Sequence, residues 1–152
     1  MQVKGFTLRP GRLEDAAWFA PRLRESDRVE VQAVAIDLEA CLRASIEASE
    51  ICMVAERQGR GVILLGCVPA PDGAGIPWLL ATDEVRPFPG ALTAIGKRYV
   101  ALFLERWPRL INAVDERNTV SIRWLQRLGF TIGEPQPFGL AGEPFRVFTM
   151  EA

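Results

Sequence analysis

The sequence predicts a mixed α/β (α+β) fold in which strands and helices are interspersed along the chain. The apolar pattern switches repeatedly between the two-residue period of strands and the three-to-four-residue period of helices. The resulting order is strand, two helices, three strands, helix, strand, helix and two strands, which gives about four helices. The chain has 152 residues, of which 49% are hydrophobic and 24% charged. Because this is the size and composition of one globular domain, we expect residues 1–152 to form a single domain.

The first elements are a short strand and a divided helix. Residues Phe6 to Arg9 alternate apolar and polar side chains, as a half-buried strand does. Apolar residues at helical spacing then run from Leu13 to Leu23, and Pro21 is expected to bend or divide this helix. The polar segment from Ser26 to Glu30 is interpreted as a connection. A second helix is expected from about Ala35 to Ala48.

The middle of the chain predicts a hairpin, a further strand and a long helix. Two apolar segments, Ile51 to Glu56 and Gly61 to Val68, flank the turn Arg57-Gln58-Gly59-Arg60. Ile76 to Ala81 is the next expected strand. The period becomes helical from Pro89, a residue that suits the first turn of a helix. The apolar stripe of this long helix consists of Leu92, Ile95, Tyr99, Leu102, Phe103 and Trp107.

The helix from Thr119 to Leu128 has the clearest ends in the sequence. Asn118 is a favourable N-cap, and Gly129 is the residue type that most often follows a helix. Strands are expected on either side of this helix, at Leu110 to Val114, Phe130 to Gly133 and Phe145 to Met150. Because the last of these strands is apolar, it is a candidate for pairing with a second copy of the chain in a homodimer.

The composition excludes several kinds of chemistry. The chain has no histidine, which removes Ser-His-Asp and Cys-His catalysis and histidine-based zinc sites. The cysteines Cys41, Cys52 and Cys67 include no close pair, so we expect neither a disulfide framework nor a metal site. Each cysteine lies in an apolar stretch. We expect buried free thiols, which suit the reducing environment of the cytoplasm.

The charge balance argues against nucleic acid and membranes as partners. Lys and Arg total 18 against 19 Asp and Glu, a net charge of −1, so no general attraction to phosphate backbones or anionic lipid is expected. Charged residues such as Lys4 and Arg9 near the start make a signal peptide unexpected. The longest apolar run, Gly61 to Ala70, is half the roughly 20 residues that a membrane helix needs.

Two segments resemble a known family. Leu8-Arg9-Pro10 followed by Glu14-Asp15-Ala16 is similar to the start of GNAT N-acetyltransferases. The segment from Asn112 to Asn118, with Ser121 to Leu125 and Leu128-Gly129-Phe130, looks like their strand, Asn turn, helix and Leu-Gly-Phe ending. The resemblance covers nearly the whole chain. It implies a three-layer fold whose central sheet is mixed, mostly antiparallel, and splayed at two parallel strands.

The resemblance also implies acetyl-CoA, or a related acyl-CoA, as acyl donor. In this family the pantetheine arm bonds the edge of the splayed strand, and the pyrophosphate meets free amides at the start of the long helix. The corresponding segment here is Arg86-Pro87-Phe88-Pro89-Gly90-Ala91. Pro89 stands where the family has glycine and has no amide hydrogen, which would cost about 1.5 to 3 kcal/mol of binding energy. Pro87 also lacks a donor, so four amides are expected to remain, those of Phe88, Gly90, Ala91 and Leu92. The candidate cofactor-binding residues are Val85, Arg86, Phe88, Gly90, Ala91, Leu92 and Asn118.

The candidates for proton transfer and for acceptor binding are acidic or basic side chains. The resemblance places Leu125 where many members carry a catalytic tyrosine, and the one tyrosine, Tyr99, falls on an apolar stripe. Asp83 and Glu84 follow the strand beside the expected splay and are the candidate bases; the alternative is two solvated loop acids. The segment that walls the acceptor site in this family supplies Asp27, Arg28 and Glu30 as substrate-binding candidates, with a solvated polar turn as the alternative.

A narrower resemblance leads to two hypotheses about function. The segments 26–30, 77–82, 118–125 and 145–148 look like the GNAT-like proteins of short-tailed phages, some of which are internal virion proteins. The first hypothesis is an N-acyltransferase that moves an acyl group from acyl-CoA to an amine by direct attack. The second is a GNAT-fold virion or host-interaction protein without turnover. The location would be the cytoplasm, of a bacterial host if the phage resemblance holds, or the virion.

Overall fold

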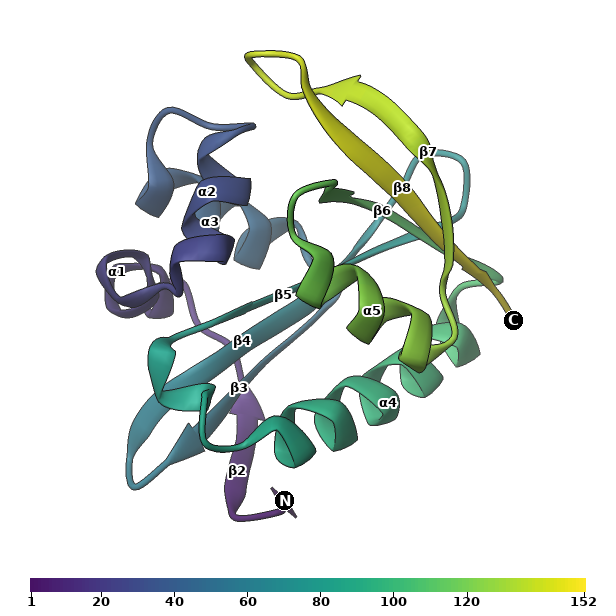
Figure 1. Cartoon of the computed structure of the whole chain (residues 1–152). Coiled ribbons are helices and arrows are strands. Elements are labelled where there is room, and N and C mark those ends of the chain that lie inside the picture. Colours follow the sequence, from purple (N-terminus) through teal and green to yellow (C-terminus); the bar gives the residue numbers. More distant parts are fainter.

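The computed structural model describes residues 1–152 as one eight-stranded sheet with helices on both faces (Figure 1). The strands are β1 (Gln2–Val3), β2 (Phe6–Pro10), β3 (Ile51–Arg57), β4 (Arg60–Pro69), β5 (Gly75–Ala81), β6 (Arg109–Asp115), β7 (Thr131–Phe138) and β8 (Glu143–Glu151). The α-helices are α1 (Asp15–Phe19), α2 (Glu25–Gln32), α3 (Leu38–Ala48), α4 (Pro89–Arg106) and α5 (Thr119–Leu128). Two 3₁₀ turns, η1 (Ala20–Arg22) and η2 (Asp83–Val85), complete the structure.

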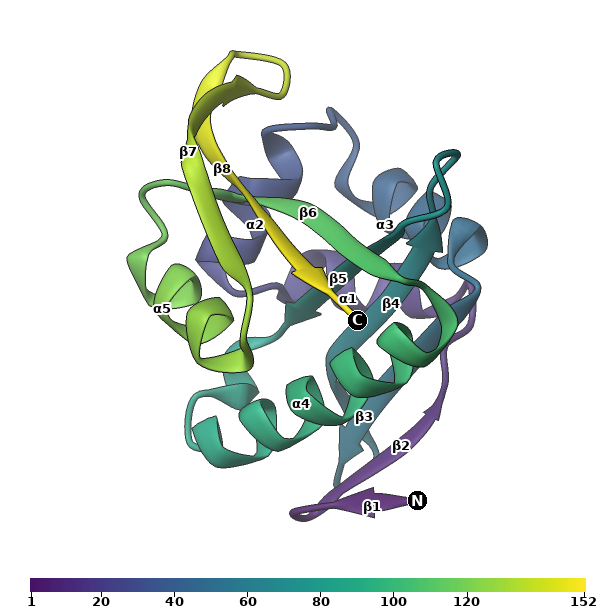
Figure 2. The ribbon, with the colours of Figure 1, turned by 90° about the vertical axis from the view of Figure 1, so that its right-hand side faces the viewer.

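The sheet is antiparallel except at one junction. Its strand order is β1-β2-β3-β4-β5-β6-β8-β7, and only β5 and β6 run parallel. These two strands share a single pair, Gly75 with Leu110, and then diverge; Figure 2 shows β6 leaving the direction of β4 and β5. The predicted mixed, mostly antiparallel sheet with a splay between two parallel strands is therefore confirmed.

The hairpin between β3 and β4 forms where the sequence predicts it. Arg57 pairs with Arg60, so the loop contains two residues, Gln58 and Gly59. Both have positive φ, 53° and 75°, which is the backbone of a type I′ turn. This turn matches the right-handed twist of the two strands.

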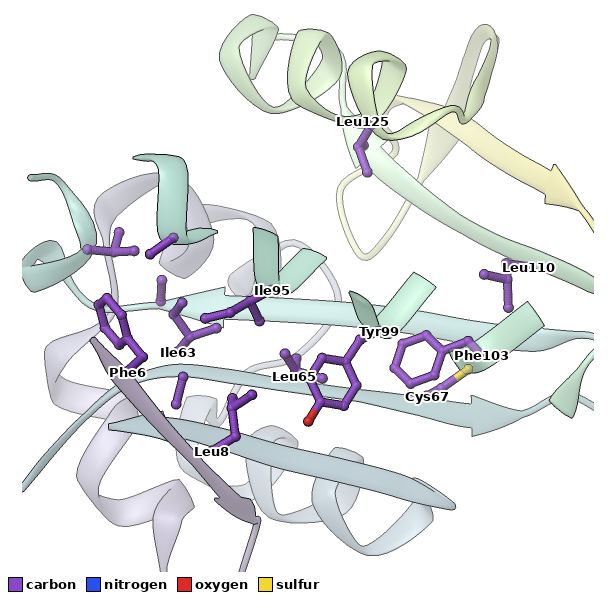
Figure 3. Packing of buried hydrophobic residues seen from close by; sticks show 14 of the residues in the cluster. Phe6, Leu8, Ile63, Leu65, Cys67, Ile95, Tyr99, Phe103, Leu110 and Leu125 are labelled. Carbon is purple, nitrogen blue, oxygen red and sulfur yellow. The ribbon is translucent and has the colours of Figure 1, made fainter. Parts of the chain in front are cut away.

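Two hydrophobic cores lie on opposite faces of the sheet. The helices α1 to α3 cover one face, where Phe19, Leu42 and Ile46 pack on Val54 and Leu64. The helices α4 and α5 cover the other face with the larger core, and Figure 3 shows part of it. Since one sheet lies between two helical layers, the predicted three-layer arrangement is confirmed.

The ends of α5 are as predicted, and their geometry explains them. The Asn118 side-chain oxygen accepts the amide of Ser121 at 3.2 Å, which satisfies one free donor of the first turn. Gly129 ends the helix at φ +109°, a conformation that side chains with a Cβ rarely adopt. Pro21 also divides the first helix, because η1 begins immediately before it.

Several sequence expectations are wrong in detail. The segment Ser26 to Glu30 is not a connection but belongs to the helix α2, and α3 begins only at Leu38, after the N-cap Asp37. On α4, Leu102 is 39% exposed and lies off the buried stripe. Of the three cysteines only Cys67 is fully buried, while the other two are half-buried.

The last strand is not available for pairing with a second copy. β8 lies between β6 and β7 and forms antiparallel ladders with both. Its two edges are therefore already hydrogen-bonded, and the expected pairing through Phe145 to Met150 is wrong. No helix has the length and apolar composition needed to cross a membrane.

Candidate functional site

A cleft of about 1240 Å³ opens where β5 and β6 diverge. On one face of the sheet it is lined by α2, α3 and the β7–β8 hairpin, and on the other by α4 and α5. Trp78 and Leu80 of β5 pack with the core beneath α1 to α3, whereas Leu79 packs with the larger core beneath α4 and α5. The cleft therefore passes through the sheet and joins its two faces.

The side chain of Asn112 separates β5 from β6 at the start of the splay. Its Nδ2 donates to the carbonyl oxygen of Pro77 at 2.7 Å, and its Oδ1 accepts the amide of Ala113 at 2.8 Å. In a regular parallel ladder Ala113 would donate to Pro77 directly. Because an amide group is inserted between the two backbones, the strands are held apart at this point.

The free edge of β5 offers one residue to a ligand. Thr82 donates to Val62 at 2.9 Å, so the even-numbered residues of β5 face β4, and the odd-numbered residues face the splay. Of these, Pro77 bonds Asn112, and Ala81 bonds Arg24 and Asp27. The amide and the carbonyl of Leu79 therefore face the cleft between two occupied positions.

Asp27 closes the far end of this edge. Its buried carboxylate accepts the amide of Ala81 and the Nε of Arg24, both at 2.8 Å, and the Arg24 amide donates to the Ala81 carbonyl at 2.9 Å. Burial raises the pKa of Asp27, against the opposing effect of Arg24. The bonds of Asp27 hold α2 on the end of β5.

Glu30 reaches across the cleft from α2 to the end of β6. Its Oε1 accepts the amide of Asp115 at 3.0 Å and the Nδ2 of Asn118 at 3.3 Å. Burial raises the pKa of Glu30 to about 7, although these two hydrogen bonds lower it. The side chain lines the cleft, and its second oxygen has no protein partner. Glu30 can therefore gain or lose a proton near neutral pH.

The start of α4 provides two free amides. Pro87 and Pro89 have no amide hydrogen, the Phe88 amide donates to Val85, and the Leu92 amide donates to Phe88. The amides of Gly90 and Ala91 remain, and a Cβ added at Gly90 would meet no atom within 4 Å. The expected cradle is thus smaller than the four amides that the sequence suggested.

The other residues near this helix start are distributed differently. Val85 is buried in the larger core and does not line the cleft. The Arg86 side chain is exposed and pairs with Asp83 at 3.2 Å. In the groove between α4 and α5, which is continuous with the cleft, Lys97 and Arg127 supply positive charge.

The expected bases lie outside the cleft. Glu84 is exposed and pairs with Arg60 at 2.8 Å, and Asp83 is exposed and pairs with Arg86. Neither of them lines the cleft, because η2 turns both outward after β5. Arg28 is also exposed, does not line the cleft, and pairs with Glu25 on the outer side of α2.

No tyrosine occupies the position expected of a proton donor. Leu125 is buried on α5 and faces the cleft. Tyr99 packs beside Phe103 in the core, and Figure 3 shows its hydroxyl pointing away from Leu125. Burial raises the pKa of Tyr99. No group of three or more cysteine, aspartate or glutamate side chains is placed to hold a metal ion.

Sequence reasoning missed three features of the cleft: the prominence of Glu30, the role of Asn112 and the single free position at Leu79. The first had a readable signal. Asp27, Glu30, Val31 and Val34 follow the i, i+3, i+4, i+7 spacing of one helical face, and all four line the cleft. The other two depend on the strand register, which the sequence does not specify.

Comparison with known proteins identifies the fold. No protein-family model and no curated protein matches the sequence. Among solved structures, Ard1 from Thermoplasma volcanium superposes with a TM-score of 0.77 at 14% identity, over 97% of this chain and 98% of that one. A ribosomal-protein-alanine N-acetyltransferase from Brucella melitensis gives 0.73 at 18% identity, over 96% and 99%.

A third structure contains a bound cofactor. YncA from Salmonella typhimurium, a putative acetyltransferase solved with acetyl-CoA, gives a TM-score of 0.68 at 13% identity, over 97% of this chain and 94% of that one. At these identities the likeness concerns architecture. The chain therefore has the fold of the GNAT acetyltransferases.

Proposed function

We propose that the protein is an N-acyltransferase that moves an acetyl group from acetyl-CoA to an amine. The observation that carries this proposal is the free position at Leu79, in a cleft that passes through the sheet. A donor can bind from one face and an acceptor from the other, and the two meet at the splay. The resemblance to GNAT enzymes and the bound acetyl-CoA of one structural neighbour support the same donor.

The donor half of the cleft fits an acyl-CoA in chemical terms. The Leu79 amide and carbonyl match the amide groups of a pantetheine arm. The free amides of Gly90 and Ala91 at the start of α4 suit the pyrophosphate, since the helix dipole favours negative charge there. Lys97 and Arg127 lie where the nucleotide end would run between α4 and α5.

Glu30 is the proposed base of the reaction. Glu30 and Leu79 line the same cleft, and the bond from the Asp115 amide holds the Glu30 carboxylate on the β6 side of the splay. An acceptor ammonium gives a proton to Glu30, and the amine nitrogen then bonds the thioester carbon. The carbon–sulfur bond breaks, the electron pair leaves on the sulfur of CoA, and the nitrogen of the new amide gives its extra proton to water. Glu30 returns its proton to solvent.

Two other assignments follow from the same geometry. Asp83 and Glu84, the bases expected from the sequence, are less favoured because both are exposed and ion-paired. With Leu125 at the usual tyrosine position, the departing thiolate takes its proton from water. A missing general acid lowers the rate by about 10²- to 10⁴-fold.

A non-catalytic role is the second candidate. The cradle at α4 has two free amides where four were expected, and this weak phosphate site favours a protein that retains the fold without turnover. In that case the partners are virion or host proteins, as the resemblance to phage proteins suggests. The proposed location is the cytoplasm for the enzyme, or the phage particle for this alternative.

Calorimetric titration with acetyl-CoA separates the two candidates. The enzyme proposal requires saturable binding and, with an amine present, release of CoA. It also requires that Glu30→Gln lower kcat by about 10²-fold or more with little change in acetyl-CoA affinity. Glu84→Gln is the matched control and should leave kcat unchanged. Absence of binding at millimolar acetyl-CoA would rule out the enzyme, and an unchanged kcat in Glu30→Gln would rule out Glu30 as base.

A further inference from the structure

The half of the cleft on the α2 and α3 face has an apolar lining. We call it the acceptor chamber; its walls are Val31, Val34, Leu42, Trp78, Leu80, Phe138 and Phe145. The Trp78 indole donates its N–H to the hydroxyl of Ser49 at 2.8 Å, so it presents no free donor. A ligand in this chamber therefore meets mostly carbon surface.

Glu30 is the one carboxylate of the chamber without an ion pair. The other carboxylate, that of Asp27, is paired with Arg24, and the same oxygen, Oδ2, also accepts the amide of Ala81. Because a buried charge needs a partner of opposite sign, the chamber provides for a single positive charge beside Glu30. A polycation would place its other charges against carbon, without partners.

Apolar side chains are also exposed beside the chamber. The Leu140 amide donates to the carbonyl of Ala33 at 2.7 Å, which joins the β7–β8 hairpin to the turn after α2. Around this bond Ile36 is 94% exposed and Leu140 is 66% exposed, and Val34 and Phe138 lie partly inside the cleft. Apolar side chains left in water beside a cleft indicate a surface that an apolar ligand covers.

We propose that the acceptor is a primary amine carried on an apolar chain or ring, with its ammonium at Glu30 and its body against Trp78 and Phe138. This inference rests on the proposed function and narrows its substrate class. The same chemistry occurs in free alkyl and arylalkyl amines and at the N-terminus of a peptide that begins with apolar residues. A polyamine or an aminoglycoside does not fit.

The test compares amines that differ in the group attached to the nitrogen. With acetyl-CoA as donor, kcat/KM is measured for butylamine, pentylamine, hexylamine, ethanolamine and spermidine, and for a short peptide with an apolar N-terminus. We expect kcat/KM to rise about fourfold per added methylene, the increment for one buried CH₂. Saturation with hexylamine but not with the peptide assigns a free amine, and the reverse assigns a peptide. Equal or faster reaction of spermidine or ethanolamine overturns the proposal.

Two variants locate the effect. Phe138→Ser removes a wall of the chamber, and Leu102→Ser removes an apolar side chain of the same 39% exposure on the outer side of α4. Phe138→Ser should lower kcat/KM for hexylamine about tenfold, because the alkyl chain loses an apolar contact worth at least one methylene. The acetyl-CoA affinity should not change. Leu102→Ser should change neither. An equal loss in both variants would contradict the assignment.

A binding experiment without the acyl donor tests this proposal separately from the proposed function. Hexylammonium is titrated into the protein without donor, and shifts of backbone amide resonances are followed by NMR. Shifts at Val31, Val34 and Leu80 that are absent with spermidine support the chamber even if acetyl-CoA does not bind. If acetyl-CoA binds but hexylammonium causes no such shifts and no turnover, the acceptor class is wrong while the donor site stands.

Discussion

The Asn112 side chain donates to the carbonyl oxygen of Pro77 at 2.7 Å and, through its other end, accepts the amide of Ala113 at 2.8 Å. One carboxamide thus replaces a direct bond between two parallel strands. Pro77 has no amide hydrogen of its own, so the inserted group costs the ladder little at this position. The separation of β5 and β6 is therefore held by the side chain of Asn112, which bonds to both strands.

Replacing Asn112 should destabilise the protein. Asn112→Ala removes two hydrogen bonds, so we expect a loss of about 2 kcal/mol in the free energy of unfolding. Asn112→Asp still accepts from Ala113 but sets a carboxylate against the Pro77 oxygen, and it should cost more at neutral pH. Urea denaturation at about pH 7 and about pH 4 checks this, because a protonated Asp can donate and should recover stability. A variant as stable as the parent would show that the spacer is dispensable.

Restoring an amide at the start of α4 should strengthen acetyl-CoA binding. Pro89→Ala supplies the missing donor between Phe88 and Gly90, and a charge-assisted bond to phosphate is worth about 1.5 to 3 kcal/mol. We expect the Kd for acetyl-CoA to fall about tenfold or more, measured by calorimetry. Pro87→Ala adds an amide outside the helix start and serves as the control. A lower Kd in both variants to the same extent would point to a general effect of losing proline.

Removing the carboxylate of Asp27 should loosen α2 from β5. Asp27→Ala leaves the Ala81 amide and Arg24 without their partner in a buried place, so we expect a loss of about 3 kcal/mol. Asp27→Asn still accepts from Ala81 and should lose less. The N-cap variant Asp37→Ala provides a scale, since an exposed cap contributes about 1 kcal/mol. Urea unfolding of the three variants gives the order, and Asp27→Ala ranking below Asp37→Ala in cost would contradict this role.

Replacing Glu30 with Gln should remove one part of the pH dependence of the protein's stability. The pKa of Glu30 is about 7 in the folded protein and 4.5 ordinarily, so between these values the folded state binds more protons than the unfolded state. The free energy of unfolding therefore falls as pH rises from about 4.5 to about 7, and this decrease is absent in the variant. Relative to the parent, Glu30→Gln should gain on the order of 3 kcal/mol between about pH 4.5 and about pH 8. Thermal or urea unfolding across this range measures it, and parallel profiles would refute the raised pKa.

The sequence predicted the fold well where local signals and packing agree. The helix from Thr119 to Leu128 has its cap, its apolar face and its terminal glycine within a dozen residues, and its bounds are those predicted. The segment around Ser26 was misread because α2 is polar on most of its surface. It is held in place by bonds from Arg24 and Asp27 to β5, more than fifty residues away in the chain.

The site was predicted less well, for a related reason. Pro89 at the start of α4 is a local feature, and its missing amide could be predicted from the sequence. The position of Glu30 beside Asp115 and Asn118 joins residues separated by 85 and 88 positions. Asp83 and Glu84 follow β5 directly, yet the 3₁₀ turn at that point directs them to Arg86 and Arg60. Sequence proximity to a strand end did not determine which way these side chains face.

The occupied positions on either side of Leu79 determine where a donor can sit along β5. Positions that face the splay recur every second residue, about 7 Å apart. Since Pro77 and Ala81 are both taken, a pantetheine arm displaced by one such step would find no bonding partner. Reactive geometries tolerate errors of about 1 Å. For the proposed reaction, β5 thus leaves a single position along the strand where the thioester can be aligned.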